Sequence, residues 1–528
     1  MPSSRHPEHP PLTERQMPTV SIGEPGSEVL ALGVRPAPAT GAAAGAGVAD
    51  AAPLPGPGTA QALAAAGLDL AQVARSSRFA AAAGSVLALA VPSGSGAGPQ
   101  RLLLVGTGDG SHQALRRAGA ALARALAGVE RADVAVLARG TEPASVRALV
   151  EGLLLGAYKP PRTGMATPPG PVGALTLDGL AGDQDTTQAV QEAVSTARAA
   201  WLARDLAATP SSVKTPAWMA ATAQALAAGV PGTSVEVMER EKLARKGFGG
   251  LLAVGAGSAT PPVLVTISWE PPSGQSRGRS PGSRHVVLVG KGITFDTGGL
   301  SIKPGEAMVP MKTDMSGAGV VLAAVLAAAR EGVAHRVTGV LALAENAVGA
   351  SSYRPGDVVT VWGGTTVEIA NTDAEGRIVL ADALAWADAT LEPDLLVDVA
   401  TLTGAASLGL GRRHAALYTA DEQLADGLLA AARASGEQAW RMPLVEDYVP
   451  DVESDVADLR HVASDKQRFG GGGSITAALF LREFAGQRRW AHLDVAGPSR
   501  AEKDEHEVCK GATGYGARLL LRWLHDLA

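Results

Sequence analysis

His285–Gly299 reads HVVLVGKGITFDTGG, and this stretch decides the fold of the chain. Its apolar run through Val289 leads directly into Gly290, Lys291 and Gly292. A short apolar run bounded by glycines predicts a buried strand. In open α/β sheets, ligand sites form where such strands end. We therefore expect functional side chains from Lys291 onward.

The sequence around this strand alternates predicted strands with predicted helices, which indicates an α/β protein. Further strands are expected at Pro262–Trp269 and Asp394–Val399. Nearer the N-terminus, a strand at Arg101–Leu104, a helix at Ala114–Leu126 and a strand at Asp133–Leu137 form a βαβ pattern. The N-terminal part of the chain and the part that contains the central strand are thus each expected to form a β-sheet.

The strand expected at Arg101–Leu104 runs into the glycine-rich segment Val105–Gly110. Its glycines are spaced G-x-G-x-G rather than G-x-G-x-x-G, and no clear acidic residue ends the next strand. We therefore interpret the segment as a tight turn, and not as a dinucleotide-binding loop.

The composition narrows the class of protein. The formal net charge is −6, with 46 basic and 52 acidic residues mixed along the chain, so there is no electrostatic footprint for nucleic acid or anionic lipid. The single cysteine, Cys509, excludes an intrachain disulfide and fits a reducing compartment. No apolar run approaches the roughly 20 residues that span a bilayer, and Val320–Ala329 is expected to be a buried helix.

Four carboxylates follow the central strand: Asp296, Asp314, Asp373 and Glu375. Taken alone, an aspartate beside glycine is most often a turn residue. Gathered in one cleft without cations, the four would repel one another or bind protons. Two divalent ions would cancel this charge, and oxygen-rich sites suit Mg, Mn or Zn. The sequence lacks H-E-x-x-H and C-x-x-C, which excludes single-zinc proteases of those types.

The joint pattern resembles the leucine aminopeptidase family of two-metal exopeptidases. The resemblance covers roughly residues 195–528 and keeps the order of the motifs, whereas the N-terminal third is similar only in its βαβ style. The matching segments are Gly290–Gly299, Ser301–Pro304, Asp314–Ala318, Tyr353–Val358, Asn371–Arg377, Ala400–Gly404, Trp490–Gly497 and Gly511–Gly514.

This resemblance implies a role for each matching residue. Asp296 and Glu375 would bridge the two metal ions, while Lys291 and Asp314 would complete the tighter site. Asp373 would complete the site that exchanges its ion more readily. The catalytic pair would be Lys303 and Arg377. Substrate binding is expected at Lys303 and at the residues that match the pocket for the N-terminal side chain: Met311, Asn371, Ala374, Thr401 and Gly404.

The residue types suit the implied chemistry. A lysine can ligate a metal only as the neutral amine, so the pKa of Lys291 must fall from about 10.4, which an adjacent dication achieves. Lys303 could stabilise the oxyanion of the tetrahedral intermediate. The planar fork of Arg377 suits a bicarbonate ion, which acts as the general base in the family. A free α-amine of the substrate could bind one metal.

The length of 528 residues predicts two domains. We expect a smaller N-terminal α/β domain and a larger catalytic domain with a mixed, largely parallel sheet flanked by helices. The expected parts are a disordered tail over 1–17, the N-terminal domain over 18–180, a linker helix over 181–210 and the catalytic domain over 211–528. The family implies a cytoplasmic homo-hexamer that releases uncharged N-terminal residues such as Leu from peptides.

Two functions from other classes remain as alternatives. Some members of the family also bind DNA, although the acidic balance argues against that role here. A catalytically silent scaffold is the second alternative, although every ligand and catalytic position is filled. His492 lies in a mostly apolar strand and is expected to be structural rather than a ligand. Gly470–Gly473 lacks the Lys-Ser/Thr of a phosphate loop, so we expect a turn before a helix at Thr476–Phe484.

Overall fold

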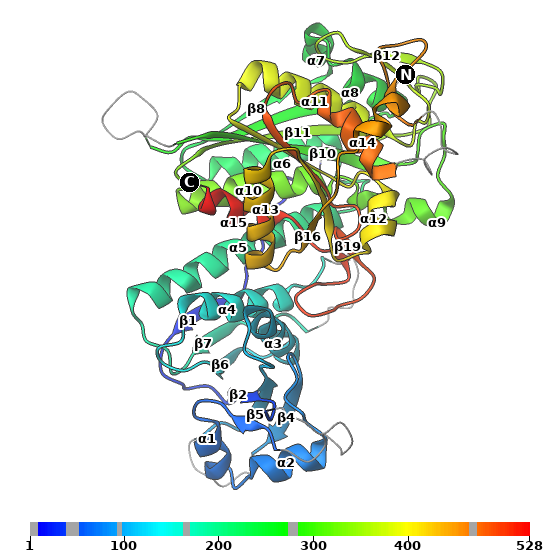
Figure 1. The fold of residues 1–528 in the computed structure, drawn as a ribbon. Helices are drawn as coiled ribbons and strands as arrows, with labels where there is room; N and C mark the ends of the chain where they lie inside the picture. The colour runs from blue at the N-terminus through cyan, green and yellow to red at the C-terminus, as the bar shows by residue number, and fades with distance from the viewer. Residues whose placement is uncertain are drawn as a thin grey trace. The chain divides into compact units, whose positions relative to one another are not determined.

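The computed structural model describes residues 9–38, 52–91, 98–161, 169–272, 283–463 and 473–527, and the chain divides into two compact units. Each unit has its own β-sheet with helices packed on it (Figure 1). The prediction of a two-domain α/β protein is therefore confirmed. The smaller unit comprises Arg15–Arg198 and Lys503–Lys510, and the larger comprises Met1–Glu14, Ala199–Glu502 and Gly511–Ala528.

The smaller unit is built on a sheet with the strand order β1-β7-β6-β2-β5-β4, in which β4 is antiparallel to β5 and the other neighbours are parallel, and β3 pairs with β2 in the antiparallel sense. The predicted βαβ pattern is present as β5, α3 and β6. The elements are β1 (Thr19–Ile22), β2 (Val29–Arg35), β3 (Leu54–Pro55), α1 (Thr59–Ala65), α2 (Leu70–Ser77), β4 (Val86–Ala90), β5 (Arg101–Gly106), α3 (His112–Ala125), β6 (Arg131–Ala135), α4 (Pro143–Ala157) and β7 (Ala174–Leu177).

The larger unit contains the longer sheet, with the order β16-β15-β18-β14-β10-β11-β9-β8, and α5 (Gln184–Ala208) leads into it. Its other elements are α6 (Pro216–Ala228), β8 (Thr233–Met238), α7 (Arg240–Lys246), α8 (Gly249–Val254), η1 (Gly255–Gly257), β9 (Val263–Trp269), β10 (His285–Asp296), α9 (Gly305–Met308), η2 (Val309–Thr313), α10 (Ser316–Glu331), β11 (Arg336–Asn346), β12 (Val358–Thr360), β13 (Thr366–Glu368), α11 (Glu375–Leu391), β14 (Leu395–Ala400), α12 (Gly404–Leu410), β15 (Ala415–Tyr418), α13 (Glu422–Ser435), β16 (Ala439–Arg441), η3 (Glu446–Val452), β17 (Leu459–Arg460), α14 (Gly473–Arg482), β18 (Arg489–Asp494), β19 (Arg500–Ala501), β20 (Gly511–Ala512) and α15 (Ala517–Asp526).

The central strand β10 is buried on both faces, as the apolar run predicts. Val286 and Leu288 pack into a core formed with α5, α6, α10, α13 and α15. The alternate residues Val287 and Val289 pack into a second core with α8, α11 and α14. Because strand side chains alternate between faces, these two cores lie on opposite sides of the sheet. β10 pairs in parallel with both β11 and β14, and β14 with β18, so the carboxyl ends of these strands share one edge.

Helix α10 is the main core helix of the larger unit. It is rich in Ala, Val and Leu on every side and is buried from Ser316 to Ala329, which is the pattern of a helix covered all round. It ends at Gly332, which adopts a left-handed cap conformation with φ 66°. At its start, a Cβ on Gly317 would lie 2.1 Å from the carbonyl oxygen of Val399 in β14. Only glycine therefore lets the first turn of α10 lie directly against the sheet.

Several predictions fall partly outside the described residues. The tail predicted to be disordered over 1–17 is described from residue 9 onward, where Leu12 N donates to Thr222 Oγ1 at 3.2 Å, and Trp218 donates its indole N–H to Pro10 O at 2.9 Å. This part of the tail lies on the larger unit because apolar and backbone groups find partners there. The loop predicted at Pro271–Arg284 and the turn at Gly470–Gly473 lie largely outside the described residues.

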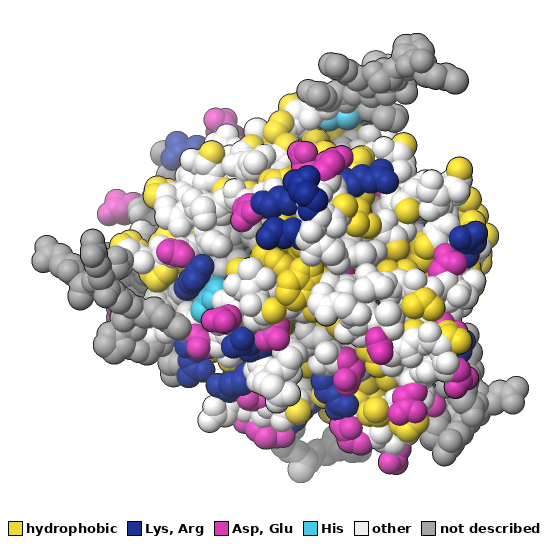
Figure 2. Space-filling model, turned by 90° about the horizontal axis from the view of Figure 1, so that it is seen from above, with side chains coloured by type: hydrophobic (Ala, Val, Ile, Leu, Met, Phe, Trp, Pro, Cys, Tyr) yellow, Lys and Arg dark blue, Asp and Glu magenta, His cyan; other side chains and the backbone are white. Residues whose placement is uncertain are grey.

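Two features of the structure agree with the composition: the most apolar helical stretch is buried, and charges of both signs are mixed on the face shown in Figure 2. Among the residues that the structure describes, Gly305–Glu331 is the one stretch long and apolar enough to cross a membrane by length and composition, but 89% of its most apolar window is buried within the protein. That burial identifies it as part of the core and matches the expectation for Val320–Ala329. On the face shown in Figure 2, basic side chains lie beside acidic ones.

Candidate active site

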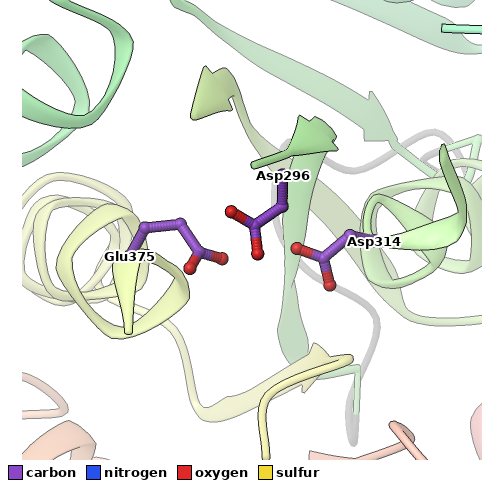
Figure 3. A group of neighbouring side chains, drawn as sticks. All are labelled: Asp296, Asp314 and Glu375. Carbon is purple, nitrogen blue, oxygen red and sulfur yellow. The ribbon is translucent and has the colours of Figure 1, made fainter. Parts of the chain in front are cut away.

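Three separate segments bring carboxylates to the edge of the sheet where β10 ends. Asp296 is the last residue of β10, Asp314 follows η2, and Glu375 is the first residue of α11. One oxygen from each of the three carboxylates lies within 4.8 Å of the others, and all three residues are buried (Figure 3). The location agrees with the expectation that ligands bind at the carboxyl ends of parallel strands.

Burial makes this cluster electrostatically costly. The pKa of Asp296 is raised by burial and then by the charge of Glu375. Burial also raises the pKa of Asp314 well above its ordinary value. Asp373, at the edge of the cluster, has its pKa raised by the same cause. A set of acids in this state binds protons or cations readily, since either one removes the repulsion.

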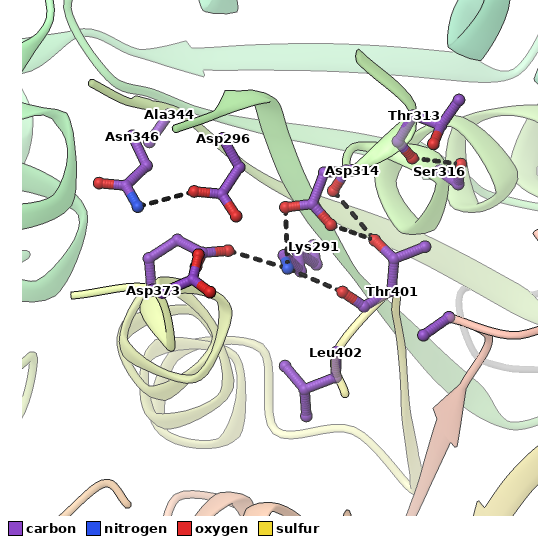
Figure 4. Close-up of polar contacts among 12 residues, drawn as sticks. Lys291, Asp296, Thr313, Asp314, Ser316, Ala344, Asn346, Asp373, Thr401 and Leu402 are labelled. Atoms are coloured by element: carbon purple, nitrogen blue, oxygen red, sulfur yellow. Dashed lines mark hydrogen bonds and ion pairs between the residues drawn. The ribbon is translucent and has the colours of Figure 1, made fainter. Parts of the chain in front are cut away.

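Lys291 lies at the centre of one part of the cluster (Figure 4). Its Nζ is 3.0 Å from Asp314 Oδ2 and 2.9 Å from Glu375 Oε1, and it donates to Thr401 O at 2.8 Å. Burial lowers the pKa of Lys291, but Asp314 and Glu375 outweigh that effect and raise it above its ordinary value. With protein groups alone around it, Lys291 is therefore an ammonium that bridges two acids.

The path of the Lys291 side chain depends on a glycine. A Cβ on Gly376 would lie 2.7 Å from Lys291 Cε and 2.8 Å from its Nζ. Gly376 stands between Glu375 and Arg377 in the first turn of α11. The absence of a side chain there lets Lys291 pass directly over the start of the helix.

Lys303 holds the other part of the cluster together. Its Nζ lies 2.7 Å from Asp296 Oδ2 and also pairs with Asp373 Oδ1. Asp296 and Glu375 raise the pKa of Lys303 against the effect of burial, which lowers it. The Lys303 side chain is 14% exposed, more than its partner Asp296 at 2%. It is therefore the cation of the cluster that an incoming molecule can reach most easily, compared with buried Lys291.

The donor set fits divalent cations. Asp314 Oδ2, Asp373 Oδ1 and Glu375 Oε1 are buried and accept no well-aligned hydrogen bond from the described residues, so a lysine ammonium is their polar neighbour. Buried carboxylate oxygens left in this state are uncommon in proteins. Oxygen atoms of carboxylates are the preferred ligands of Mg²⁺ and Mn²⁺, and Zn²⁺ also accepts them.

Asn346 supports the cluster and was missed by the sequence analysis. It ends β11 directly beside Asp296, its partner in the strand register. Its Nδ2 donates to Asp296 Oδ1 at 2.8 Å and to Thr372 O at 3.0 Å. A signal was present, because a polar residue ends the apolar run of a strand that neighbours β10. Asn346 fixes the direction of one carboxylate and ties it to the loop before α11.

Thr372 makes the second link that the sequence analysis missed. Its Oγ1 donates to Gly298 O at 2.7 Å and accepts from Ser301 N at 2.8 Å. Its carbonyl accepts from the hydroxyl of Tyr353 at 2.9 Å. The loop that carries Asp373 is thus joined to the turn that leads to Lys303. Nothing in the local sequence distinguishes this buried threonine from a neighbouring loop residue.

Arg377 lies two residues after Glu375 and is buried. Its guanidinium donates through Nη1 to the carbonyl oxygen of His461, and burial lowers its pKa to about 10. The His461 ring contacts Asn371 O at 2.9 Å and Glu368 O at 3.1 Å. Burial lowers the pKa of His461 to about 4, so the ring is neutral near pH 7. His461 therefore joins Arg377 to the loop before α11, a link that the sequence did not predict.

The expected pocket residues lie on segments around the cluster. Thr401 is in direct contact, since its Oγ1 donates to Asp314 Oδ1 at 2.8 Å. Asn371 Oδ1 accepts from Asp373 N at 2.9 Å, and Ala374 directly precedes α11. Met311 lies in η2, and Gly404 is the exposed first residue of α12. The pocket assignment remains a prediction.

His492 is structural, as expected. It lies fully buried in β18, where its Nδ1 is 2.5 Å from Asp398 Oδ1, and its ring stacks on Tyr418 with centroids 5.9 Å apart. Asp398 also accepts from the indole N–H of Trp490 at 2.8 Å.

The glycine-rich segment after β5 is a tight turn, as the sequence predicts, because Gly108 and Gly110 have positive φ and Gly110 N donates to Thr107 O.

Comparison with known proteins gives matches over both units. The catalytic-domain model of the cytosol aminopeptidase family matches residues 201–521, and the N-terminal-domain model of the same family matches residues 47–163. A probable cytosol aminopeptidase of Leifsonia xyli subsp. xyli is 43% identical over 446 residues, covering 82% of this chain and 86% of that protein. One from Streptomyces coelicolor is 44% identical over 430 residues, covering 78% and 80%.

Solved structures with similar folds also match this chain. The bottromycin maturation enzyme BotP in complex with Mn has a TM-score of 0.79 at 36% identity, covering 95% of this chain and 99% of that one. A mutant of tomato leucine aminopeptidase has a TM-score of 0.83 at 30% identity, covering 98% of each chain. The likeness therefore extends over both units and includes a protein whose structure was solved in complex with Mn.

Proposed function

The chain belongs to the cytosol aminopeptidase family, and we propose that it releases N-terminal residues from peptides with two divalent metal ions held at the β10 edge of the larger unit. The observation that carries the proposal is the buried carboxylate cluster, in which Asp314 Oδ2, Asp373 Oδ1 and Glu375 Oε1 accept no well-aligned hydrogen bond from the described residues. The proposed ligands are those expected from the sequence: Lys291, Asp296, Asp314, Asp373 and Glu375.

The geometry supports two neighbouring positions rather than one. Lys291 contacts Asp314 and Glu375, and Lys303 contacts Asp296 and Asp373, so the acids form two groups. Asp296 and Glu375 are near enough to interact electrostatically, which suits residues shared between two ions. When bound, the pair of ions would activate a water molecule and polarise the scissile carbonyl.

Two cationic side chains, Lys303 and Arg377, are not proposed as metal ligands and could act on the substrate. Lys303 is partly exposed, and it could turn from its carboxylate partners to the oxygen of the scissile carbonyl as negative charge develops there. Arg377 is held at one nitrogen by His461 O, and its planar fork could hold a bicarbonate ion as the general base. We propose these two residues as the catalytic pair.

The substrate is proposed to be a peptide with a free N-terminus, because its α-amine would bind at the metal pair. The residues proposed to receive the first side chain are small or apolar apart from Asn371 and Thr401, which favours uncharged side chains such as Leu. One methylene in an apolar pocket changes binding by about 1–3 kcal/mol, so the preference should be broad. Mn²⁺ is the first candidate ion because BotP binds it, and Zn²⁺ is the second.

The setting of the enzyme is also part of the proposal. The family name supports a cytosolic protein, and the single cysteine fits a reducing compartment. A homo-hexamer with the larger units at its centre is proposed from the family resemblance alone. Sedimentation of the purified protein at micromolar concentration would give the mass of the assembly directly.

Hydrolysis of a panel of aminoacyl amides by chelated enzyme would test the proposal. Activity should be lost on chelation and should return with Mn²⁺ or Zn²⁺, with uncharged residues released fastest. Leucine amide and its N-acetylated form make the matched pair, since they differ only at the amine. Efficient cleavage of the acetylated substrate, or full activity after metal removal, would contradict the proposal.

A further inference from the structure

Two lysines from outside α5 donate hydrogen bonds to the carbonyl groups at the C-terminal end of that helix. The Nζ of Lys214 donates to Leu206 O at 3.0 Å and to Ala207 O at 3.1 Å. The Nζ of Lys312 donates to Ala208 O at 2.8 Å. The last carbonyls of a helix lack partners within the helix and attract cations through the helix dipole. Here two ammonium groups donate to three of these carbonyls, those of Leu206, Ala207 and Ala208.

Lys214 is far more buried than a lysine in an ordinary cap. Its relative exposure is 0%, and its pKa is lowered well below the ordinary value, first by burial and then by Lys312. Its hydrogen bonds go to backbone carbonyls, and the three donors of its ammonium group match three carbonyl oxygens. Burial of an ammonium without a carboxylate partner is costly, so the arrangement needs a reason beyond capping.

The third bond of Lys214 supplies that reason. Its Nζ donates to Lys312 O at 2.5 Å, across 98 positions of sequence. Lys312 lies in η2, the short helix that contains Met311 and leads directly into Asp314. The two lysines therefore tie η2 to the end of α5 twice, once through a carbonyl of η2 and once through a side chain of η2.

We propose that Lys214 is a positioning residue of the metal site: it fixes η2 against α5, so that the Asp314 carboxylate faces Lys291 and Glu375. The inference rests on the proposed function, since it assigns Asp314 to a metal. A capping role alone would need only the bonds to Leu206 and Ala207. The bond to Lys312 O acts on the segment that delivers the ligand.

Lys214→Met tests the inference, because methionine keeps an unbranched side chain that is only one heavy atom shorter and removes all three donors. The measurement is calorimetric titration of chelator-treated protein with Mn²⁺, well below the melting temperature of each variant. The tighter dissociation constant should rise about 10- to 100-fold, the usual effect of losing a group that orients a ligand. Lys312→Met, at a partly exposed side chain with one bond, should shift it in the same direction by less.

Glu437→Gln is the matched control. Glu437 is also buried, and its carboxylate accepts from Gly516 N and Leu519 N at 2.9 Å each, so its loss disturbs the same unit at α15 instead of η2. It should keep the Mn²⁺ affinity of the wild type. Unchanged affinity in Lys214→Met, or in Lys312→Met if the first variant does not fold, would overturn the inference. So would an equal loss in the control.

The outcome for the wild type separates this inference from the proposed function. A wild-type protein that binds no Mn²⁺ or Zn²⁺ would overturn the proposed function, and the inference with it. A wild type that binds metal, beside a Lys214→Met variant that binds it equally well, would overturn the positioning role alone.

Discussion

In each unit a glycine-rich turn follows a buried strand, with an aspartate in the turn or directly before it, yet the two aspartates differ in burial and in the direction of their pKa shifts. Asp109, after β5 in the smaller unit, is exposed, and hydrogen bonds from Ser111 lower its pKa. Asp296, at the end of β10 in the larger unit, is 2% exposed, and burial raises its pKa. Glycine and aspartate after a strand thus predict a turn. Burial beside other carboxylates is what makes a site.

The contrast also appears in the partners of the two carboxylates. Asp109 Oδ1 accepts from Ser111 N at 3.0 Å, a bond within its own turn. Asp296 Oδ1 accepts a similar local bond from Gly298 N at 2.8 Å, but Asp296 is also held by Asn346 from the neighbouring strand and by Lys303 from a later loop. A turn residue can be understood from its local sequence, whereas a site residue depends on segments brought together by the fold.

The largest difference should appear when a carboxylate is removed from each region. Glu375→Ala should abolish metal binding at both positions and lower kcat/KM by more than about 10⁴-fold, beyond the usual 10²–10⁴-fold loss of a general base. Asp109→Ala is the matched control and should change kcat/KM by less than about twofold, as for most exposed substitutions. Metal analysis of the desalted proteins checks both. A fully active Glu375→Ala would show that the bridging assignment is wrong.

Arg377→Ala should separate binding of metal from catalysis. Because a guanidinium cannot ligate a cation, the variant should keep the metal content of the wild type. Its kcat should fall by roughly 10²–10⁴-fold if the general base is lost, and KM should change less. Added bicarbonate should stimulate the degassed wild type much more than the variant. Loss of the ions in Arg377→Ala would mean that the residue supports the site structurally.

Asn346→Ala should have a smaller effect, since it removes a partner of a ligand instead of a ligand. Asp296 would lose one of its orienting hydrogen bonds, and the link to Thr372 O would be broken. Metal affinity should fall about 10- to 100-fold, with kcat largely restored at saturating Mn²⁺. Ser111→Ala, which removes a partner of Asp109, serves as the equivalent change in the smaller unit and should leave metal affinity unaltered. Equal affinities in wild type and Asn346→Ala would rule out this supporting role.

The smallest expected effect is on the pH dependence of stability, and it comes from a buried base, His461. Burial lowers the pKa of His461 from 6.5 to about 4 in the folded protein. Between these values the unfolded chain binds a proton that the native state does not, so the free energy of unfolding falls as pH falls. The contribution is complete above pH 6.5 and is lost as pH falls through 4. The effect of one group is at most about 1.4 kcal/mol per pH unit.

His461→Gln should therefore show a shallower loss of stability between pH 6.5 and 4 than the wild type. Urea denaturation at half-unit steps of pH measures the two slopes. Above pH 7 the two proteins should differ by a constant amount, which provides the internal control. Parallel curves through the acid range would mean that the His461 ring titrates normally in the folded protein.

Much of the fold could be predicted from the sequence because the pattern is local. The apolar run at His285–Val289 predicts β10, and the alternation of strands and helices predicts an α/β protein, as observed. The strand and helix of the first βαβ pattern are also present. Local periodicity does not reveal where the N-terminal segment lies, which depends on partners such as Thr222 far along the chain.

The candidate site could be predicted only in part. Motif resemblance selects the charged residues, because their types carry the chemistry. Asn346, Thr372 and His461 are absent from that selection, since their importance comes from the hydrogen bonds that they make across the fold. Lys214 is missed for the same reason, because its partners stand 7, 8 and 98 positions away.

Gly376 has a consequence at the level of the gene. Every single-nucleotide missense change in a glycine codon introduces a residue with a Cβ, and a Cβ here would collide with the end of Lys291. That side chain could move aside, but only by leaving Asp314, Glu375 and Thr401 O. The fold would survive such a change better than the site would. Variation at this codon should thus be removed by selection on activity, even where the protein is still made in normal amounts.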